Sequence, residues 1–282
     1  EGVDIICDAR ALNVIKDGEM VVGVAARIDM QVRYFKARGG VVLTSGGFIM
    51  NREMVADYAP RLARGNYRNG NPNDTGDGIR MGLDAGGVGV NMDEGFICTP
   101  FYPPKQFVES IIVDETGNRF INEDVYHGRL GAFVVRQQSE RVYFILSVEQ
   151  YGDYERVSYM GSGVAGTGET VQELEEELEL REGTLKQTIK VYNEDCVSGK
   201  DTQCHKAAEW LEPLVPPLVA LDITPGRGSF LPFFTLGGLD TLPTGEVVDP
   251  QRDVIPGLYA AGRTACGVVR RAEGYSLSRI AR

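Results

Sequence analysis

The alternation of apolar and polar positions at the start of the chain predicts β-strands. Val3, Ile5 and Cys7 place apolar residues at every second position, and an Asp-Gly hairpin signal at 17–18 precedes an apolar run at 20–25. A further strand is expected around 31–35. The chain therefore begins as a set of short strands joined by tight turns.

An apolar run that ends in glycines gives the clearest structural signal. Residues 39–48 read Gly-Gly-Val-Val-Leu-Thr-Ser-Gly-Gly-Phe. Such a run is typical of a buried parallel strand whose carboxyl end meets a ligand. Asn51 is then placed to cap a short helix that ends before Pro60, and a second helix is expected from 73–78 through Ala85.

The middle of the chain mixes helix and strand signals. Helical spacing recurs at 170–180, with Thr170 as the expected cap, and again at 184–193. The acidic run Glu173–Glu179 predicts a solvated helix face, and the glycine-rich stretch 159–168 predicts a loop. The last third returns to strands and turns. Strand-rich ends around a mixed middle predict one domain built from both ends, with a second domain inserted.

Charge and composition narrow the function classes. Lys and Arg number 29 against 40 Asp and Glu, and the net charge of −11 disfavours binding to nucleic acid or an anionic membrane. No apolar run reaches the ~18 residues of a transmembrane helix. The five cysteines are few and widely spaced, which favours a reduced, cytoplasmic protein without a metal site. The 35 glycines exceed the usual share and indicate close backbone approach to a ligand.

Five short motifs appear in an order that resembles a known family. They are Val41–Phe48, Thr75–Gly78, Gly117–Glu123, Thr235–Leu239 and Ile255–Gly262. In this order they resemble the FAD-dependent fumarate reductase and 3-ketosteroid dehydrogenase flavoproteins. The resemblance implies an α+β fold, in which a partial Rossmann-like FAD-binding domain at 1–55 and 236–282 carries an inserted α+β catalytic domain at 56–235.

Within the family, the chain is most similar to the 3-ketosteroid Δ4-(5α)-dehydrogenases. The similarity is carried by Ala59–Leu62, Glu123–Arg129, Gly262–Thr264 and Gly274-Tyr275. It implies an FAD-dependent oxidoreductase of the EC 1.3 type, which acts on CH–CH groups. A small apolar 3-ketosteroid is the implied substrate, and an external electron acceptor is the implied partner. The resemblance does not separate Δ4 from Δ1 chemistry.

Two departures from the family pattern bear on activity. The family's amino-terminal strand, with the Gly-x-Gly-x-x-Gly turn that binds the FAD pyrophosphate, is absent, so the chain is interpreted as a piece that begins inside the FAD domain. After Tyr275, the family's closing segment is either shortened by four residues or replaced by a shifted reading frame. An inactive fragment that does not bind FAD alone is therefore one alternative.

The resemblance also implies catalytic roles. Desaturating the steroid ring needs a base for the acidic proton beside the ketone, a hydride acceptor and a donor to the developing enolate oxygen. By resemblance, Tyr275 is the base and Tyr126 belongs to the relay that carries the proton away. The family has a serine two residues after the base, where this chain has Leu277, so Ser276 or Ser278 is the expected substitute. Ordinary half-buried tyrosines are the structural alternative.

The residues around the Thr-Leu-Gly-Gly motif indicate the substrate class. The dicarboxylate-reducing branch carries a histidine there that grips a substrate carboxylate, whereas this chain has Phe233 and Phe234. We expect these side chains, with Gly238, to contact a flat apolar substrate; packing in the core is the alternative for at least one. A fumarate- or urocanate-type reductase is the enzymatic alternative. Glu123 either delivers a proton, as in that branch, or pairs with Arg119 to hold the loop.

Cofactor contacts are expected mainly at glycine-containing turns. The residues that the resemblance assigns to FAD are Ala11, Ser45, Gly46, Gly47, Asp77, Gly262, Arg263, Ser276 and Leu277. Glycine at a strand end lets the backbone approach the cofactor. If four residues are deleted after Tyr275, Ser276 and Leu277 are flavin contacts and not catalysts.

Overall fold

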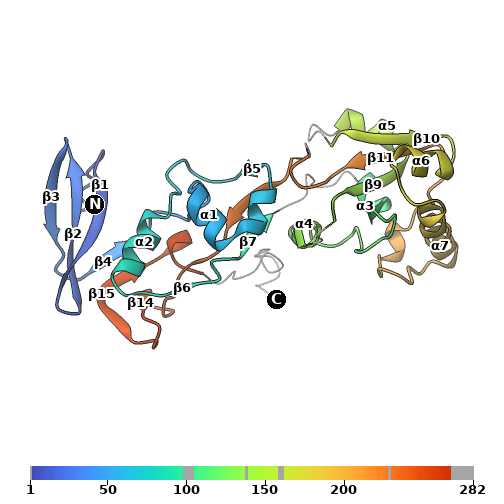
Figure 1. Cartoon of the computed structure of the whole chain (residues 1–282). Helices are drawn as coiled ribbons and strands as arrows, with labels where there is room; N and C mark the ends of the chain where they lie inside the picture. Colours follow the sequence, from blue (N-terminus) through green and yellow to red (C-terminus); the bar gives the residue numbers. More distant parts are fainter. Residues whose placement is uncertain (1, 98–104, 137–138, 158–161, 228–229, 268–282) are drawn as a thin grey trace. The chain divides into compact units, whose positions relative to one another are not determined.

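The computed structural model describes residues 2–97, 105–136, 139–157, 162–227 and 230–267. The chain divides into two compact units, whose elements are labelled in Figure 1. Unit 1 comprises Glu1–Pro60, Arg68–Gly95 and Phe234–Arg282, and unit 2 comprises Arg61–Tyr67 and Phe96–Phe233. Residues 68–95, expected within the inserted segment, therefore group with both ends of the chain, because helix α2 (Asp77–Asp84) packs against Leu239 and Thr264.

Unit 1 is built from small sheets and short helices. Strands β1 (Arg10–Asp17), β2 (Met20–Ile28) and β3 (Gln31–Lys36) form an antiparallel sheet in chain order. A second sheet has the order β14-β15-β4, from Glu246–Val248, Val254–Ala260 and Val41–Leu43. Strand β15 is antiparallel to β14 and parallel to β4. The short strands β6 (Gly89–Val90) and β13 (Gly238–Leu239) also pair.

Several local predictions for unit 1 are confirmed. Asp17 pairs with Met20 across the hairpin, and β3 lies where the third strand was expected. Helix α1 (Arg52–Tyr58) begins after Asn51, whose Oδ1 accepts from the Met54 amide at 3.1 Å. That bond satisfies one of the amide groups that a helix leaves unpaired at its start.

One strand prediction is wrong, and another is confirmed only in part. Residues 3–7 form no strand, and Val3 and Ile5 are 79% and 83% exposed. Alternation identifies an amphipathic segment, but a strand also needs a partner, and none of the described residues pairs with this segment. The parallel strand expected within 39–48 is confirmed as β4, but it is shorter and less buried than expected, with Val42 59% exposed, and it lies at an edge of its sheet.

Unit 2 has an antiparallel sheet with apolar clusters on both faces. Its order is β10-β11-β9-β8, from Val164–Gly168, Leu218–Asp222, Val142–Ser147 and Ile111–Asp114. Phe144 packs with residues of α4 (His127–Arg136), whereas Tyr143 packs with residues of α6 (Val171–Glu177) and α7 (Thr184–Ser198). Because successive strand residues face opposite sides, two covered faces explain why β9 is apolar along its length.

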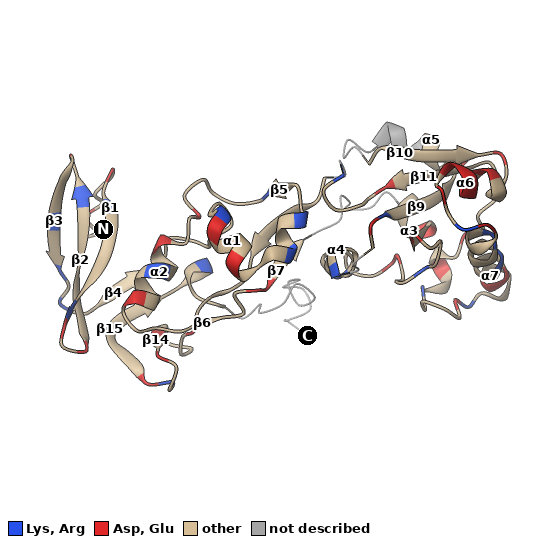
Figure 2. Ribbon diagram, viewed as in Figure 1, with Lys and Arg blue, Asp and Glu red and all other residues tan. Residues whose placement is uncertain are grey.

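The acidic helix face in unit 2 is only partly solvated. Figure 2 shows Asp and Glu gathered on α6 and α7. Glu173 and Glu176 are exposed, but Glu175 is 2% exposed and accepts from the amides of Gly183 and Lys186, both at 2.9 Å. Glu175 therefore satisfies amide groups at the start of α7, a role that a charge count along one helix does not reveal.

The remaining elements complete the two units. They are α3 (Lys105–Glu109), α5 (Val148–Val157), and the 3-10 turns η1 (Pro60–Arg64), η2 (Ala208–Trp210) and η3 (Gly262–Thr264). Strands β5 (Tyr67–Arg68), β12 (Pro232–Thr235) and β7 (Gly95–Ile97) form a three-stranded sheet in that order.

Two further expectations concern the middle of the chain. The helices after Thr170 and at 184–193 are confirmed, and Thr170 Oγ1 accepts from the Glu173 amide at 3.2 Å. The prediction of a loop at 159–168 is wrong for residues 164–168. These residues form strand β10, because they pair with β11. Among the described helices, none has the length and apolar character that a membrane crossing requires.

Candidate functional site

Two parallel strands end side by side in unit 1. Ala260 of β15 pairs with Leu43 of β4, and the Ala261 amide donates to the Leu43 carbonyl at 3.1 Å. The segments after these strands leave the sheet at the same edge, where parallel sheets usually bind ligands. These segments contain five residues that the resemblance assigns to FAD, namely Ser45, Gly46, Gly47, Gly262 and Arg263.

Hydrogen bonds join this edge to its neighbours. Thr264 Oγ1 donates to the Gly46 carbonyl at 3.1 Å, and Ser45 Oγ accepts from the Gly78 amide in α2 at 3.1 Å. Gly46 and Gly262 have φ angles of 86° and 64°, which favour glycine. A Cβ at Gly262 would meet no atom within 4 Å among those described, so the backbone there is open to a ligand.

Asp74 lies at this edge and was missed by sequence reasoning. Its side chain is 4% exposed, and its Oδ2 forms an ion pair with Arg263 Nη2. The same oxygen accepts from the Asn71 amide at 2.9 Å. Asp74 and Arg263 lie 189 positions apart, and no local pattern in the sequence connects them.

The structure also brings together Ala11 and Asp77, two further residues expected at FAD. They line a hollow of about 410 Å³ formed by Arg10, Ala11, Leu12, Arg27, Asp77, Arg80, Met81 and Asp84. Asp77 lies 2.7 Å from Arg80 and 3.4 Å from Arg10. Burial raises the pKa of Asp77, but the hydrogen bond from Arg80 and the charges of both arginines lower it below its ordinary value. The hollow thus presents guanidinium groups around a fixed carboxylate.

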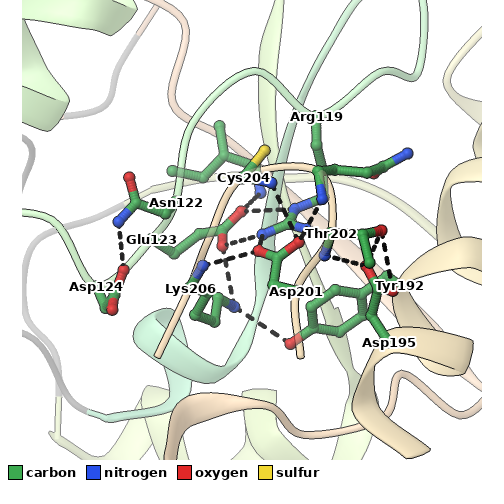
Figure 3. A network of polar contacts seen from close by, with 12 residues as sticks. Arg119, Asn122, Glu123, Asp124, Tyr192, Asp195, Asp201, Thr202, Cys204 and Lys206 are labelled. Atoms are coloured by element: carbon green, nitrogen blue, oxygen red, sulfur yellow. Dashed lines mark hydrogen bonds and ion pairs between the residues drawn. The ribbon is translucent and has the colours of Figure 1, made fainter. Parts of the chain in front are cut away.

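A cluster of buried charges lies in unit 2 (Figure 3). Arg119 contacts both oxygens of Glu123, with Nε to Oε1 at 3.2 Å and Nη2 to Oε2 at 2.8 Å. It also contacts both oxygens of Asp201, at 3.1 and 3.0 Å. Lys206 Nζ lies 2.9 Å from Glu123 Oε2. None of these four side chains is exposed, so two cations and two carboxylates balance one another in the interior.

Burial and pairing have opposite effects on most pKa values in this cluster. Burial lowers the pKa of Arg119, but Glu123 and Asp201 raise it above its ordinary value. Burial lowers the pKa of Lys206, and attraction by Glu123 offsets only part of that effect. Burial raises the pKa of Asp201, but hydrogen bonds from Arg119 and the Lys206 amide lower it to about 2. Burial raises the pKa of Cys204 to about 11.

The contacts of Glu123 indicate that it pairs with Arg119 to hold the loop, and they argue against a role in proton delivery. Its oxygens accept from the Ile112 amide at 2.8 Å, from Arg119 at two points and from Lys206. A protonated carboxyl needs an acceptor for its own O–H, and the groups around Glu123 are donors. Sequence reasoning found the Arg119–Glu123 pair but missed Asp201 and Lys206, which enter from a segment about 80 residues further along the chain.

Tyr126 lies on the turn that follows Glu123. Its ring is half-buried, with centroids 4.4 Å from His127 and 6.3 Å from Phe96. A hydrogen bond also connects this turn to the segment that contains Lys206, because Asp124 Oδ2 accepts from the Ala207 amide at 2.9 Å. The other expected catalytic and tail residues, Tyr275, Ser276, Leu277 and Ser278, lie outside the described residues.

The residues expected on the substrate side differ in their surroundings. Phe233 and Phe234 are 2% and 9% exposed. Phe233 packs on Gly65, where a Cβ would lie 2.5 Å from its ring, so core packing is the better account of this side chain. Neighbouring residues of a strand face opposite sides, which directs Phe234 away from Phe233. Gly238 is buried, and a Cβ there would lie 2.7 Å from the carbonyl carbon of Ala265.

Comparison with known proteins identifies the family. The chain belongs to the FAD binding domain family, whose model matches residues 1–276. A solved structure of 3-ketosteroid-Δ4-(5α)-dehydrogenase from Rhodococcus jostii RHA1, in complex with 4-androstene-3,17-dione, is 33% identical with a TM-score of 0.88. The match covers 96% of this chain and 56% of that one.

Curated relatives come from both branches of the expected family. A fumarate reductase (cytochrome) of Shewanella frigidimarina is 28% identical, over 99% of this chain and 50% of the relative. A 3-oxosteroid 1-dehydrogenase of Mycolicibacterium smegmatis is 26% identical, over 95% of this chain and 55% of the relative. The chain thus spans about half the length of these relatives. The resemblance to FAD-dependent flavoproteins and the α+β fold are confirmed.

FAD is the cofactor that this family membership implies, and the strand edge in unit 1 fits it. Ser45, Gly262 and Arg263 are exposed there and offer a hydroxyl, an open backbone and a guanidinium. Donors of these kinds match the acceptor oxygens and ring nitrogens of a flavin dinucleotide.

Proposed function

We propose that this chain is part of an FAD-dependent dehydrogenase that desaturates ring A of a 3-ketosteroid. The observation that carries the proposal is Phe234 immediately before Thr235, at the position where the dicarboxylate-reducing branch carries a histidine that grips a substrate carboxylate. The Thr235 hydroxyl is held in place by the Phe48 amide at 3.3 Å. The 33% identity to a ketosteroid enzyme across 96% of this chain supports the same substrate class.

The proposed chemistry removes one proton and one hydride from adjacent carbons, and a C=C bond forms between them. When bound, FAD supplies the hydride acceptor, and an external electron acceptor later takes both electrons. The Tyr275 oxygen takes the proton beside the ketone, and Tyr126 passes it toward solvent. Glu123 and Arg119 hold the turn that carries Tyr126, which keeps the phenol at a fixed position.

A fumarate- or urocanate-type reductase remains the second candidate, since the Shewanella frigidimarina enzyme is 28% identical over 99% of this chain. Proton delivery in such a reductase needs an acid near the flavin. The four donor contacts of Glu123 argue against that role here. The third candidate is a fragment that binds no FAD by itself.

The visible spectrum of the purified chain with added FAD separates these candidates. Under anaerobic conditions, the 4,5-saturated counterpart of 4-androstene-3,17-dione is expected to bleach the flavin band, and succinate is not. Bleaching by succinate alone would support the reductase. If a desalting column separates the flavin from the chain, the chain does not hold FAD and is the inactive fragment.

The proposed base is tested in the same assay. Tyr275→Phe is expected to slow bleaching by about 100-fold or more while FAD stays bound, because it removes the proton acceptor. Tyr34→Phe is the matched control, since Tyr34 is 74% exposed on β3. Equal rates in the two variants would contradict the assignment of Tyr275.

A further inference from the structure

Asp74 is a buried carboxylate at the ligand edge of unit 1. It is 3% exposed as a residue, and it precedes the Thr-Gly-Asp-Gly motif that starts α2. Burying a charge is costly unless other groups pair with it. Here the Asn71 amide and the Arg263 guanidinium both donate to Oδ2, so the charge is compensated by one neutral and one cationic donor.

Two glycines make the space that Asp74 occupies. A Cβ at Gly46 would lie far inside contact distance of Asp74 Oδ1, and a Cβ at Gly70 would lie 2.7 Å from Oδ2. The absence of side chains at Gly46 and Gly70 therefore leaves room for the Asp74 carboxylate. Gly46 is also one of the residues assigned to FAD, so the carboxylate packs directly under the turn at the end of β4.

The Arg263 side chain links this carboxylate to the surface. Its Nη2 contacts Asp74, while 41% of the side chain is exposed. Within the described part of the chain, no second acceptor receives a hydrogen bond from this guanidinium. A guanidinium has five N–H groups in a rigid plane, so fixing one side of the plane orients the others. Thr264, the next residue, donates to the Gly46 carbonyl at 3.1 Å, which holds the two segments in register.

We propose that Asp74 is a positioning residue of the cofactor site, which acts by orienting Arg263 toward acceptor oxygens of FAD and by supporting the Gly46 turn. The proposal deepens the proposed function because it rests on the same cofactor site, but it does not depend on the steroid. Without the carboxylate, the guanidinium can rotate freely. Binding of FAD must then also supply the free energy that fixes this side chain, so the affinity for FAD falls.

The test measures FAD affinity of the full chain by fluorescence titration. Asp74→Asn and Arg263→Gln are each expected to weaken FAD binding by about tenfold or more. The double variant is expected to be about as weak as the weaker single variant, because the two side chains act as one unit. Arg263→Lys, which keeps the charge but loses the planar fork, is expected to recover only part of the affinity.

Asp240 and Arg252 provide a matched control pair in unit 1. Arg252 Nη1 lies 2.8 Å from Asp240 Oδ2, with side-chain exposures of 64% and 7%, close to the arrangement of Arg263 and Asp74. Asp240→Asn and Arg252→Gln are expected to lower the thermal midpoint without changing FAD affinity. A merely structural role for Asp74 predicts the same outcome for both pairs.

Three results would overturn the proposal. They are unchanged FAD affinity in Asp74→Asn, losses that multiply in the double variant, and no FAD binding by the wild-type chain. If Asp74→Asn does not fold, the FAD affinities of Arg263→Gln and Arg263→Lys test the proposal instead. The Arg263 side chain is partly exposed, so its replacement should leave the fold intact. A wild-type chain that binds FAD but does not oxidise the ketosteroid would overturn the proposed function and leave this proposal standing.

Discussion

The Lys206 ammonium nitrogen lies 2.9 Å from Glu123 Oε2, and neither side chain is exposed to solvent. Lys206 also donates to the Ser110 carbonyl at 2.5 Å and to the Tyr192 hydroxyl at 3.2 Å. All three donor positions of the ammonium group thus have acceptors. This arrangement connects the end of one loop to the motif that contains Arg119 and Glu123.

Replacing Lys206 with methionine should destabilise the protein strongly. The change keeps an apolar stem of similar length but leaves Glu123 with one cation fewer in the interior. We expect a loss of about 3–5 kcal/mol in the free energy of unfolding, measured by urea denaturation. Lys190→Met is the control, because Lys190 pairs with Glu194 at 3.9 Å on the surface and should cost about 0.5 kcal/mol or less. Similar small losses in both variants would contradict the buried pairing.

The stability contribution of Asp201 should depend on pH. Its folded-state pKa of about 2 lies below the ordinary value of 3.8. A carboxyl with a depressed pKa stabilises the fold fully above the ordinary value and loses that contribution as the pH falls through the folded value. The difference in unfolding free energy between wild type and Asp201→Asn should therefore shrink between about pH 4 and pH 2.

The control for this pH experiment is Asp29→Asn. Asp29 is 84% exposed, so its difference from wild type should stay small across the same range. A pH-independent gap for Asp201→Asn would mean that the carboxylate is not preferentially ionised in the folded state.

Gly46→Ala should lower stability more than Gly183→Ala, because the two positions have the same backbone strain but only Gly46 lacks space for a Cβ. Gly46 and Gly183 have similar φ angles of 86° and 84°. A Cβ at Gly183 meets nothing within 4 Å among described atoms, so Gly183→Ala should cost about 1 kcal/mol from backbone strain alone. At Gly46 the added methyl group also displaces Asp74, for a total of about 2–4 kcal/mol. Thermal denaturation of both variants gives the comparison.

Alkylation should distinguish two cysteines by their surroundings. Cys7 is exposed, whereas burial raises the pKa of Cys204 to about 11. The thiolate is the reactive form, so iodoacetamide at about pH 8 should label Cys7 well before Cys204 in the folded chain. Peptide mass spectrometry over time measures both rates, and the difference should disappear in urea. Equal labelling without denaturant would place Cys204 outside a buried environment.

Features that depend on neighbours in the sequence could be predicted. The Asn51 cap needs only the Met54 amide three residues later, and the hairpin at 17–18 needs only its own two strands. The order of five motifs likewise placed Ser45 and Gly262 in one site, and the structure brings them to one sheet edge. These signals are local, or are carried by short motifs that stay together.

Features that depend on distant partners could not be predicted. Asp74 meets Arg263 across 189 positions, and Asp201 meets Arg119 across 82. Nothing near either carboxylate indicates which arginine it meets, since the path of the whole chain decides. The same limit explains the error at Val3–Cys7, where the pattern suits a strand but gives no information about its partner.

The order of segments in unit 1 has a consequence for synthesis on the ribosome. Strand β4 ends at Leu43, but its partner β15 ends at Ala260, so β4 emerges about 200 residues before it can pair. At translation rates of about 5–20 residues per second, the delay is roughly 10–40 s. Unit 2 is made almost entirely within that interval. Strand β4 therefore stays without its β15 partner while unit 2 is synthesised, and unpaired apolar segments of this kind are prone to aggregation during folding.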